Sequence, residues 1–386
     1  MKRADRSAPI VIRPVETRRD LVRFVQLPGD LYRDDPAFIP PLIFERLQHL
    51  DPRRNPFFKH AEVRFWIAER DGRAVGRISA QLDRMVPDAS DGVREGHFGF
   101  LDAEDSAETF SLLLGTAEAW LRERGAGRAI GPFSLSINDE SGLLIKGFET
   151  PPFVMMGHAP RYGGVRMEEQ RYGKAKDIIA YSYDLAAEPA PSLAAFLRKA
   201  LNTGALSFRA MDPRRFDEEI ALVVRIFNDA WAGNWGFVPF SNDDLEYLAK
   251  TIRPILRGGD VAFGELEGRP AAMAVCLPNV NEAIADFSGR VLPANWLKLL
   301  WRLKVKGLKT ARLPLMGVLR EHQGTPLGAA LMIGVVDRVR AWHRVHGTEV
   351  AELSWILEEN RPVRRVIEAM GGRPYKTYRL YRKQLA

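Results

Sequence analysis

The order of secondary-structure elements expected from this 386-residue chain repeats once, and this repetition limits the fold more than any other feature. Apolar periodicity in the first half predicts a strand, a helix, a hairpin, a strand, a helix and a strand. They are expected at residues 10–14, 18–31, 62–69 with 74–82, 96–101, 106–124 and 128–131. Asp71-Gly72 lies between the two hairpin runs and supplies the positive φ that a tight turn requires.

The second half predicts the same order and then continues it. The expected elements are a strand at 206–210, a helix at 216–231, a hairpin at 261–265 with 270–277, a strand at 313–319, a helix at 327–346, a strand at 350–356, a helix at 361–370 and a strand at 375–382. The proline-rich segment 187–191 reads as a linker. We therefore predict a mixed α/β protein with two domains, residues 1–188 and 189–386, each a mixed central β-sheet flanked by helices.

Composition excludes several classes of protein. Cys276 is the one cysteine, so neither a disulfide framework nor a cysteine zinc site is expected, and the seven histidines form no metal-binding spacing. No apolar run approaches the ~20 residues that span a bilayer. The N-terminus lacks an apolar signal core, so we expect a cytoplasmic protein. The net charge of +7 comes without a nucleic-acid motif, and no nucleic-acid partner is expected.

The sharpest local signal is the segment 317–331, in which a strand, a glycine-containing turn and a long helix follow one another. Free backbone amides and the helix dipole make such a helix N-terminus a binding site for phosphate. Glycine lets a ligand approach the backbone closely. From the glycines alone, an ordinary strand-to-helix turn is the favoured interpretation.

Two segments together resemble one known family. Residues 323–331, Gln-Gly-Thr-Pro-Leu-Gly-Ala-Ala-Leu, resemble the pyrophosphate loop of GNAT acyltransferases, and residues 352–372 resemble that family's closing strand, asparagine, short helix and glycine turn. The resemblance implies two tandem GNAT-like domains, of which the second binds acyl-CoA or an acyl carrier thioester. The first domain lacks this loop. At the corresponding place it has the acidic segment 102–106, which would repel a pyrophosphate. The cofactor-binding residues implied are Val318, Leu319, Arg320, Gln323, Gly324, Thr325, Leu327, Gly328 and Asn360.

The sequence departs from this family at two positions. Pro326 occupies the first glycine position of the loop and removes one amide donor. Ile367 occupies the position of the family's tyrosine general acid and cannot donate a proton. Thiolate departure must therefore use another donor, such as a water molecule.

Amine acylation also needs a base for the amine proton. The candidates are Glu352 on the strand beside the loop, and Glu321 and His322 in the loop itself. Strand alternation places Glu352, Ser354 and Ile356 on one face. For each candidate taken singly, a solvated charge is the favoured interpretation.

An aromatic segment follows the helix at 216–231. In the GNAT layout this region lines the acceptor side, and it carries Asn228, Trp231, Asn234, Trp235 and Phe237. These residues predict an aromatic-walled pocket for a long apolar substrate with a polar head. The alternative is that the aromatic residues are core and the asparagines are caps.

The segment 296–309 carries five basic residues and no acidic one. At helical spacing its apolar residues share a face opposite Lys298, Arg302, Lys306 and Lys309. This pattern is typical of a helix in an anionic membrane interface, and it predicts peripheral membrane contact on the inner face of the membrane. The expected contact residues are Trp296, Leu299, Leu300, Trp301 and Leu303. An ordinary core-packed helix with a solvated basic face is the alternative.

The tandem arrangement, the segment 228–239 and the segment 138–148 are similar to the GNAT-type ceramide synthases of bacteria. This similarity implies transfer of a long-chain acyl group from acyl-CoA to the amine of a sphingoid base, a lipid acceptor. Two other functions stay open from the residues alone. One is N-acetylation of a small polar amine or amino acid, and the other is acyl-CoA binding by a degenerate domain without catalysis.

Overall fold

The computed structural model describes residues 8–89 and 91–385. The chain divides into two compact units that exchange segments. The first unit holds residues up to Ile178 together with Ile284–Asn295 and the segment from Lys376 onward, and the second holds Ile179–Ala283 and Trp296–Tyr375. The main division thus falls ten residues before the predicted boundary at 188/189. Residues 179–188, at the end of the first half of the sequence, therefore belong to the second unit, and the segment from Lys376 onward, at the end of the second half, belongs to the first unit.

The first unit contains the elements expected for the first half and several more. Its strands are β1 (Ile10–Pro14), β2 (Ala61–Arg70), β3 (Arg73–Asp83), β4 (Glu95–Ala103), β5 (Arg128–Gly131), β6 (Leu143–Lys146) and the beginning of β7 (Gly173–Asp184). Its helices are α1 (Arg18–Leu31), α2 (Ile43–His49), α3 (Phe57–His60), α4 (Ala107–Glu123) and α5 (Gly163–Glu169).

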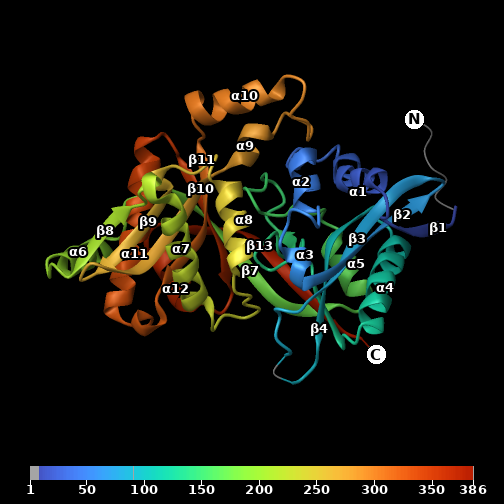
Figure 1. Ribbon diagram of the computed structural model, residues 1–386, viewed down its shortest axis with the longest axis horizontal. Helices are drawn as coiled ribbons and strands as arrows, with labels where there is room; N and C mark the ends of the chain where they lie inside the picture. Colours follow the sequence, from blue (N-terminus) through green and yellow to red (C-terminus); the bar gives the residue numbers. More distant parts are fainter. Residues whose placement is uncertain (1–7, 90, 386) are drawn as a thin grey trace. The chain divides into compact units, whose positions relative to one another are not determined.

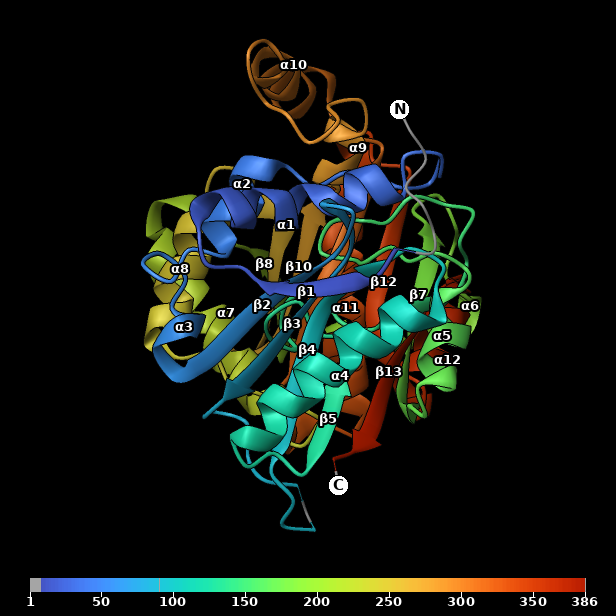
Figure 2. The same cartoon turned by 90° about the vertical axis from the view of Figure 1, so that its right-hand side faces the viewer.

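The sheet of the first unit has the order β1-β2-β3-β4-β5-β13, where β13 (Arg373–Gln384) is the last strand of the chain. β13 runs antiparallel to β5, with Tyr381 opposite Gly131. Helix α4 packs on this sheet, chiefly against β3 (Figure 2). Its Phe110, Leu113, Leu114 and Leu121 side chains are buried, whereas Leu112 is exposed. A separate core cluster joins Phe24 of α1 to Phe65 and Phe100 of the sheet.

The second unit contains the other elements of the chain. Its strands are β8 (Leu206–Ala210), β9 (Val261–Leu266), β10 (Arg269–Pro278), β11 (Thr310–Val318), β12 (Val350–Leu357) and the rest of β7. Its helices are α6 (Pro191–Leu201), α7 (Phe216–Trp231), α8 (Asn242–Ile252), α9 (Val280–Ile284), α10 (Asn295–Trp301), α11 (Pro326–Val345) and α12 (Arg361–Ala369). The last residue of α9, Ile284, and the first residue of α10, Asn295, belong to the first unit. Short 3₁₀ turns are formed by Pro213–Arg215, Gly258–Asp260 and Arg320–His322.

The strand order of the second unit is β8-β9-β10-β11-β12-β7. Helices α11 and α7 cover opposite faces of this sheet. A methyl group added at Gly264 of β9 would meet Leu331 and Val335 of α11, whereas one added at Gly317 of β11 would meet Ala230 and Ile226 of α7. Both helices are labelled in Figure 1.

The mixed α/β architecture predicted from the sequence is confirmed, and so are most of the predicted elements. The sequence analysis missed α2, α3, β6, α5 and β7 in the first half, and α6, α8 and α9 in the second. The predicted helix at 296–309 is shorter than expected. It ends at Trp301 and passes into a π-helical turn at Arg302–Lys306.

Candidate functional site

A wedge opens in the sheet of the second unit between two parallel strands. Within the described chain, β11 and β12 pair with each other from Thr310↔Val350 to Leu313↔Leu353 and not beyond these residues. Both strands nevertheless continue, β11 to Val318 and β12 to Leu357. A ligand entering the wedge would meet backbone groups that a complete sheet would have paired.

A β-bulge marks the point where the wedge begins. Leu277 of β10 lies opposite Arg312, and Val275 lies opposite Leu315. Between these two pairs β11 therefore contains one residue more than β10. This residue reverses the alternation of side chains along the strand. Leu313 and Val318 therefore both belong to the core under α11, although they are separated by an odd number of positions. Strand bulges of this kind commonly redirect side chains beside functional sites.

A buried polar cluster lies at the closed end of the wedge, where Arg312 and Glu352 face each other across the strands. Both side chains are fully buried, and Arg312 Nε lies 3.6 Å from Glu352 Oε1. The Ser354 hydroxyl donates to Glu352 Oε1 at 2.8 Å and accepts from Arg312 Nε at 2.9 Å. The Tyr375 hydroxyl donates to Glu352 Oε2. The Arg312 guanidinium also lies 4.7 Å from the ring centre of Trp355.

The glycine-containing turn lies at the open end of the wedge, where β11 leads into α11. Thr325 is the N-cap of α11. Its hydroxyl donates to the His322 carbonyl at 2.7 Å and accepts from the Gly328 amide at 3.0 Å. Gly328 has no room for a side chain, since an added Cβ would lie 2.1 Å from the His322 carbonyl oxygen. Gly324 has a φ of +72° and open space around it.

The turn offers fewer free backbone amides for an anion than the sequence predicted. Pro326 has no amide hydrogen, the Gly328 amide is taken by Thr325, and the amides of Gln323 and Thr325 donate to Arg320 and His322. Of the turn residues 323–328, Gly324 and Leu327 keep amides for which the described chain provides no acceptor. These two amides and the dipole of the 20-residue helix α11 are suited to hold a phosphate.

Other predicted cofactor residues stabilise the turn itself. The Gln323 side-chain amide donates to the Ala230 carbonyl at 2.9 Å and to the Val318 carbonyl at 2.8 Å. The Arg320 backbone amide donates to Asp229 Oδ2 at 2.8 Å, while its guanidinium remains largely exposed. Asn360 is the N-cap of α12, 3.4 Å from the Val363 amide. Gln323 and Asn360 therefore have structural roles whatever they contact in a ligand.

The three predicted base candidates lie in two places. Glu352 is at the closed end of the wedge, whereas Glu321 and His322 follow β11 at the open end. The strand between Leu313 and Val318 separates these ends by about 15 Å at the usual rise per residue. His322 Nε2 lies 3.4 Å from Glu321 Oε1, and the Glu321 carboxylate is mostly exposed. These residues are not brought together into one acid–base centre.

The predicted acceptor residues pack on α7 and its following loop. Asn228 binds the backbone of Phe240 through both its amide nitrogen and its oxygen, each at 3.0 Å. The Trp231 indole N–H donates to the Met316 carbonyl on β11 at 3.0 Å. The rings of Trp231 and Phe237 lie 5.2 and 5.7 Å from Phe227, which is buried. Asn234 and Trp235 are half-buried in the same loop. Trp231 thus connects this aromatic group to the strand that borders the wedge.

The corresponding region of the first unit contains internal ion pairs. Asp102, near the end of β4, accepts from Arg77 Nε at 2.8 Å and from the Tyr32 hydroxyl at 2.8 Å. In the turn at 136–142, Glu140 is paired with Arg46 of α2. The Arg46 guanidinium keeps the pKa of Glu140 below its ordinary value, although burial alone would raise this pKa. Charges paired in this way are typical of structural sites.

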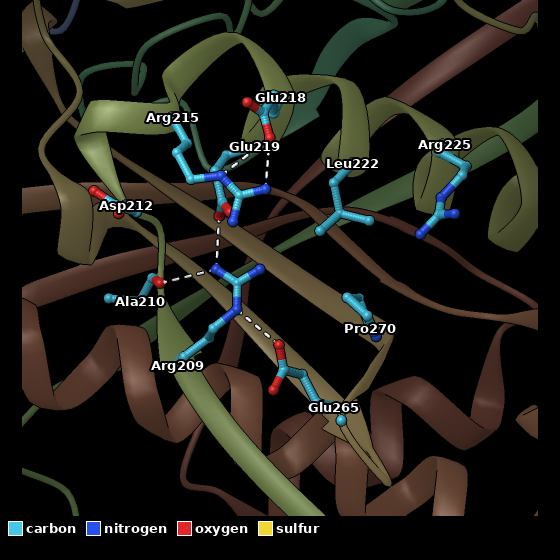
Figure 3. Close-up of a pocket in the computed structure, with 11 residues that line it drawn as sticks. Arg209, Ala210, Asp212, Arg215, Glu218, Glu219, Leu222, Arg225, Glu265 and Pro270 are labelled. Carbon is cyan, nitrogen blue, oxygen red and sulfur yellow. Dashed lines mark hydrogen bonds and ion pairs between the residues drawn. The ribbon is translucent and has the colours of Figure 1, made fainter.

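A separate cavity of about 540 Å³ lies beside β8 and the first turns of α7 (Figure 3). Charged side chains dominate its lining. Arg209 bridges Glu219 and Glu265, each at 2.7 Å, and Arg215 pairs with Glu218. The residues that line it include none of those predicted for acyl-CoA, the acceptor or catalysis. Such a polar lining does not suit a long acyl chain.

The α10 segment exposes apolar side chains together with lysines. Trp296, Leu300 and Trp301 are 43%, 49% and 53% exposed. Leu299 and Leu303 are half-buried instead. Leu297 and Val305, which the sequence analysis did not include, are exposed. In Figures 1 and 2 α10, in orange, projects away from β9–β11. Among the described residues, no helix is long and apolar enough to cross a bilayer, and no group of three or more potential ligands could hold a metal ion.

Sequence reasoning missed Arg312, Ser354 and Tyr375 as members of the polar cluster. One signal for Arg312 was available, namely a single charge inside the otherwise apolar strand 311–318. Ser354 had been placed on the correct face of β12 but given no role. Tyr375 had no signal, because its contact with Glu352 depends on how two strands lie in space.

Comparison with solved structures defines the class of protein. The chain superposes on a tandem GNAT protein from the clavulanic acid biosynthesis pathway with a TM-score of 0.57 and 15% identity, covering 98% of this chain and 99% of that one. A GCN5-related N-acetyltransferase from Sphaerobacter thermophilus gives a TM-score of 0.53 and 14% identity, with 98% and 97% covered. Together with the wedge and the turn before α11, these similarities define a tandem GNAT fold.

Sequence relatives define the family. The chain is 45% identical to the bacterial ceramide synthase of Caulobacter vibrioides over 379 residues, 98% of each chain. It is 40% identical to protein YghO of Escherichia coli over 380 residues, 97% of this chain and 95% of that one. No family model matches the sequence. The chain belongs to the family of the bacterial ceramide synthase, a family of acyl-transferring enzymes.

Proposed function

We propose that this protein transfers a long-chain acyl group from acyl-CoA to the amine of a sphingoid base. The observation that carries the proposal is the 45% identity to the bacterial ceramide synthase over nearly the whole of both chains. The tandem GNAT fold supports it, because a wedge beside a helix N-terminus can hold a thioester and its phosphates. The substrate assignment rests on the relative, and the chemistry rests on the site.

In this proposal the acyl-CoA pyrophosphate binds the amides of Gly324 and Leu327 at the N-terminus of α11. Arg320, whose guanidinium is largely exposed beside the turn, adds positive charge. The backbone of Val318 and Leu319 borders the open end of the wedge, and the thioester lies within the wedge. Glu352 at its closed end provides the carboxylate for acid–base catalysis. The aromatic residues Trp231 and Phe237 lie on the acceptor side.

The acceptor is a lipid amine, and we propose that α10 places the enzyme on the cytoplasmic face of a membrane that contains it. Exposed tryptophans favour the interfacial region of a bilayer, and Lys298, Lys304 and Lys306 in the same segment favour anionic headgroups. The large exposed apolar side chains support this assignment, because a helix in water gains nothing from them.

Replacing Trp296 and Trp301 by serine is expected to weaken binding to vesicles that contain phosphatidylglycerol by at least ~30-fold. Trp296 and Trp301 are 43% and 53% exposed, so burying each ring in the interface contributes at least about 1 kcal/mol, and loss of both costs at least about 2 kcal/mol. Vesicle sedimentation would measure it, with Phe44→Ser as a control, since Phe44 is 66% exposed in the first unit. Salt should weaken wild-type binding. Equal binding by the double variant and the wild type would contradict the membrane contact.

The function itself is tested with palmitoyl-CoA and a panel of amines: sphinganine, its 3-oxo form, free amino acids and polyamines. Mass spectrometry follows free CoA and the amide. We expect an amide of a sphingoid base from the wild type and none from Gly324→Glu, which places a negative charge at the anion site. Turnover of polar amines alone would overturn the lipid assignment. Binding of acyl-CoA without turnover of any amine would indicate a degenerate domain.

A further inference from the structure

Glu352 cannot reach a substrate directly, although it is the carboxylate at the closed end of the wedge. Its side chain is fully buried, and both of its oxygens are occupied. Oε1 accepts from Ser354, which is itself buried and bound to Arg312. Oε2 accepts from Tyr375. A proton can therefore reach Glu352 only through one of these partners.

The three partners differ in what lies beyond them. Arg312 is permanently charged and fully buried, so it cannot accept a proton. Ser354 is 2% exposed, and its hydroxyl lies between Glu352 and Arg312, away from any surface that a substrate could approach. Tyr375, at the start of β13, is half-buried rather than buried, and its hydroxyl is both a donor and an acceptor. Among the three, Tyr375 alone is both half-buried and able to donate and accept a proton.

We propose that Tyr375 transfers protons between the reacting atoms and Glu352, and that it thereby replaces the absent tyrosine at Ile367. The inference rests on the proposed function, because it assumes that the acyl thioester lies in the wedge. Ile367 is buried in the core under α11, which agrees with its having no chemical role. Glu352 acts through Tyr375 and is a positioning residue, whose charge Arg312 and Ser354 hold in place.

The reaction balances with these groups alone. The neutral amine uses its lone pair to form the C–N bond, and the carbonyl π electrons move to oxygen. One amine proton passes to the Tyr375 oxygen while the Tyr375 proton passes to Glu352 Oε2. The oxyanion then restores the carbonyl, and the C–S bond breaks with its electron pair on sulfur. Glu352 returns its proton to Tyr375, which protonates the thiolate. Amide and CoA thiol leave, and both residues are unchanged.

A purely structural Tyr–Glu contact predicts different behaviour, and the chain offers a matched control for it. Tyr181 of β7 is buried, donates to Glu368 Oε1 at 3.0 Å and accepts from Arg364 Nε at 2.9 Å. Its replacement by phenylalanine removes a similar hydroxyl from the same unit without touching the cluster of Glu352. Tyr181→Phe is therefore expected to keep the wild-type pH profile of kcat.

The test compares Tyr375→Phe, Glu352→Gln and the double variant with the wild type on whichever amine the wild type acylates. General acid–base catalysis contributes about 10²–10⁴-fold, so each single variant should lower kcat by that range. The double variant should be no slower than the singles, because both residues serve one path. The KM for acyl-CoA should change less than about twofold in either single variant. The kcat of each single variant should continue to rise with pH over the pH range in which the kcat of the wild type has become constant.

Several outcomes would overturn the proposal. Tyr375→Phe with wild-type kcat and pH profile would remove the proton-transfer role while leaving the acyltransferase assignment intact. A wild type that acylates no amine would overturn that assignment and this inference together. If Tyr375→Phe does not fold, single turnovers of the wild type in H₂O and D₂O decide the matter. The inference requires a slower rate in D₂O with a curved dependence on deuterium fraction, and equal rates would contradict it.

Discussion

Gly328→Ala is expected to lower the affinity for CoA by about 100-fold. The added methyl group would lie 2.1 Å from the His322 carbonyl oxygen, a distance that no real Cβ contact tolerates, so the backbone of the turn must move. The same carbonyl accepts from Thr325, whose hydroxyl also caps Gly328. A misplacement of about 1 Å can cost a factor of about 100 in the positioning of a bound substrate, and we expect a loss of that order for CoA. Isothermal titration calorimetry with CoA measures this loss.

Gly324→Ala is the matched control in the same turn. Its φ of +72° disfavours an L-residue, but an added methyl group meets no atom within 4 Å. The cost is therefore only the left-handed backbone strain of about 1–2 kcal/mol, which limits the loss of affinity to between about 5- and 30-fold. Circular dichroism checks that both variants keep α11. Wild-type affinity in Gly328→Ala would mean that CoA phosphates bind elsewhere.

Arg312→Met is expected to lower the free energy of unfolding by about 3–5 kcal/mol, because it leaves Glu352 buried without its positive partner. Arg312 and Glu352 both have no exposed surface and lie 3.6 Å apart. The double variant Arg312→Met with Glu352→Gln removes both charges, so most of the lost stability should return. Urea denaturation of the wild type and both variants measures the difference. A loss below about 1 kcal/mol in Arg312→Met would show that Glu352 does not depend on Arg312 for charge balance.

Local chemistry made several parts of the structure predictable. The hairpin turn at Asp71-Gly72 and the strand, turn and helix from 313 to 346 were expected near their observed positions, because turn residues and periodicity act over short distances. α10 shows the limit of this reasoning. An unbroken helix was expected over 296–309, but α10 ends at Trp301 and a π-turn begins at Arg302. There the Arg302 guanidinium donates to the Ala283 carbonyl and Arg257 donates to the Leu303 carbonyl.

Short-range sequence patterns alone predicted most of the order of elements, the tandem α/β character and the turn before α11. The tertiary structure decided the wedge, the exchange of the chain's late segments between the two units, and the cluster in which Tyr375 meets Glu352. These features depend on how strands are aligned with one another, which short-range sequence patterns do not specify. Alternation tells which residues of a strand share a face, but the bulge in β11 reverses that alternation. Which strands become neighbours depends on the packing of segments far apart in the sequence.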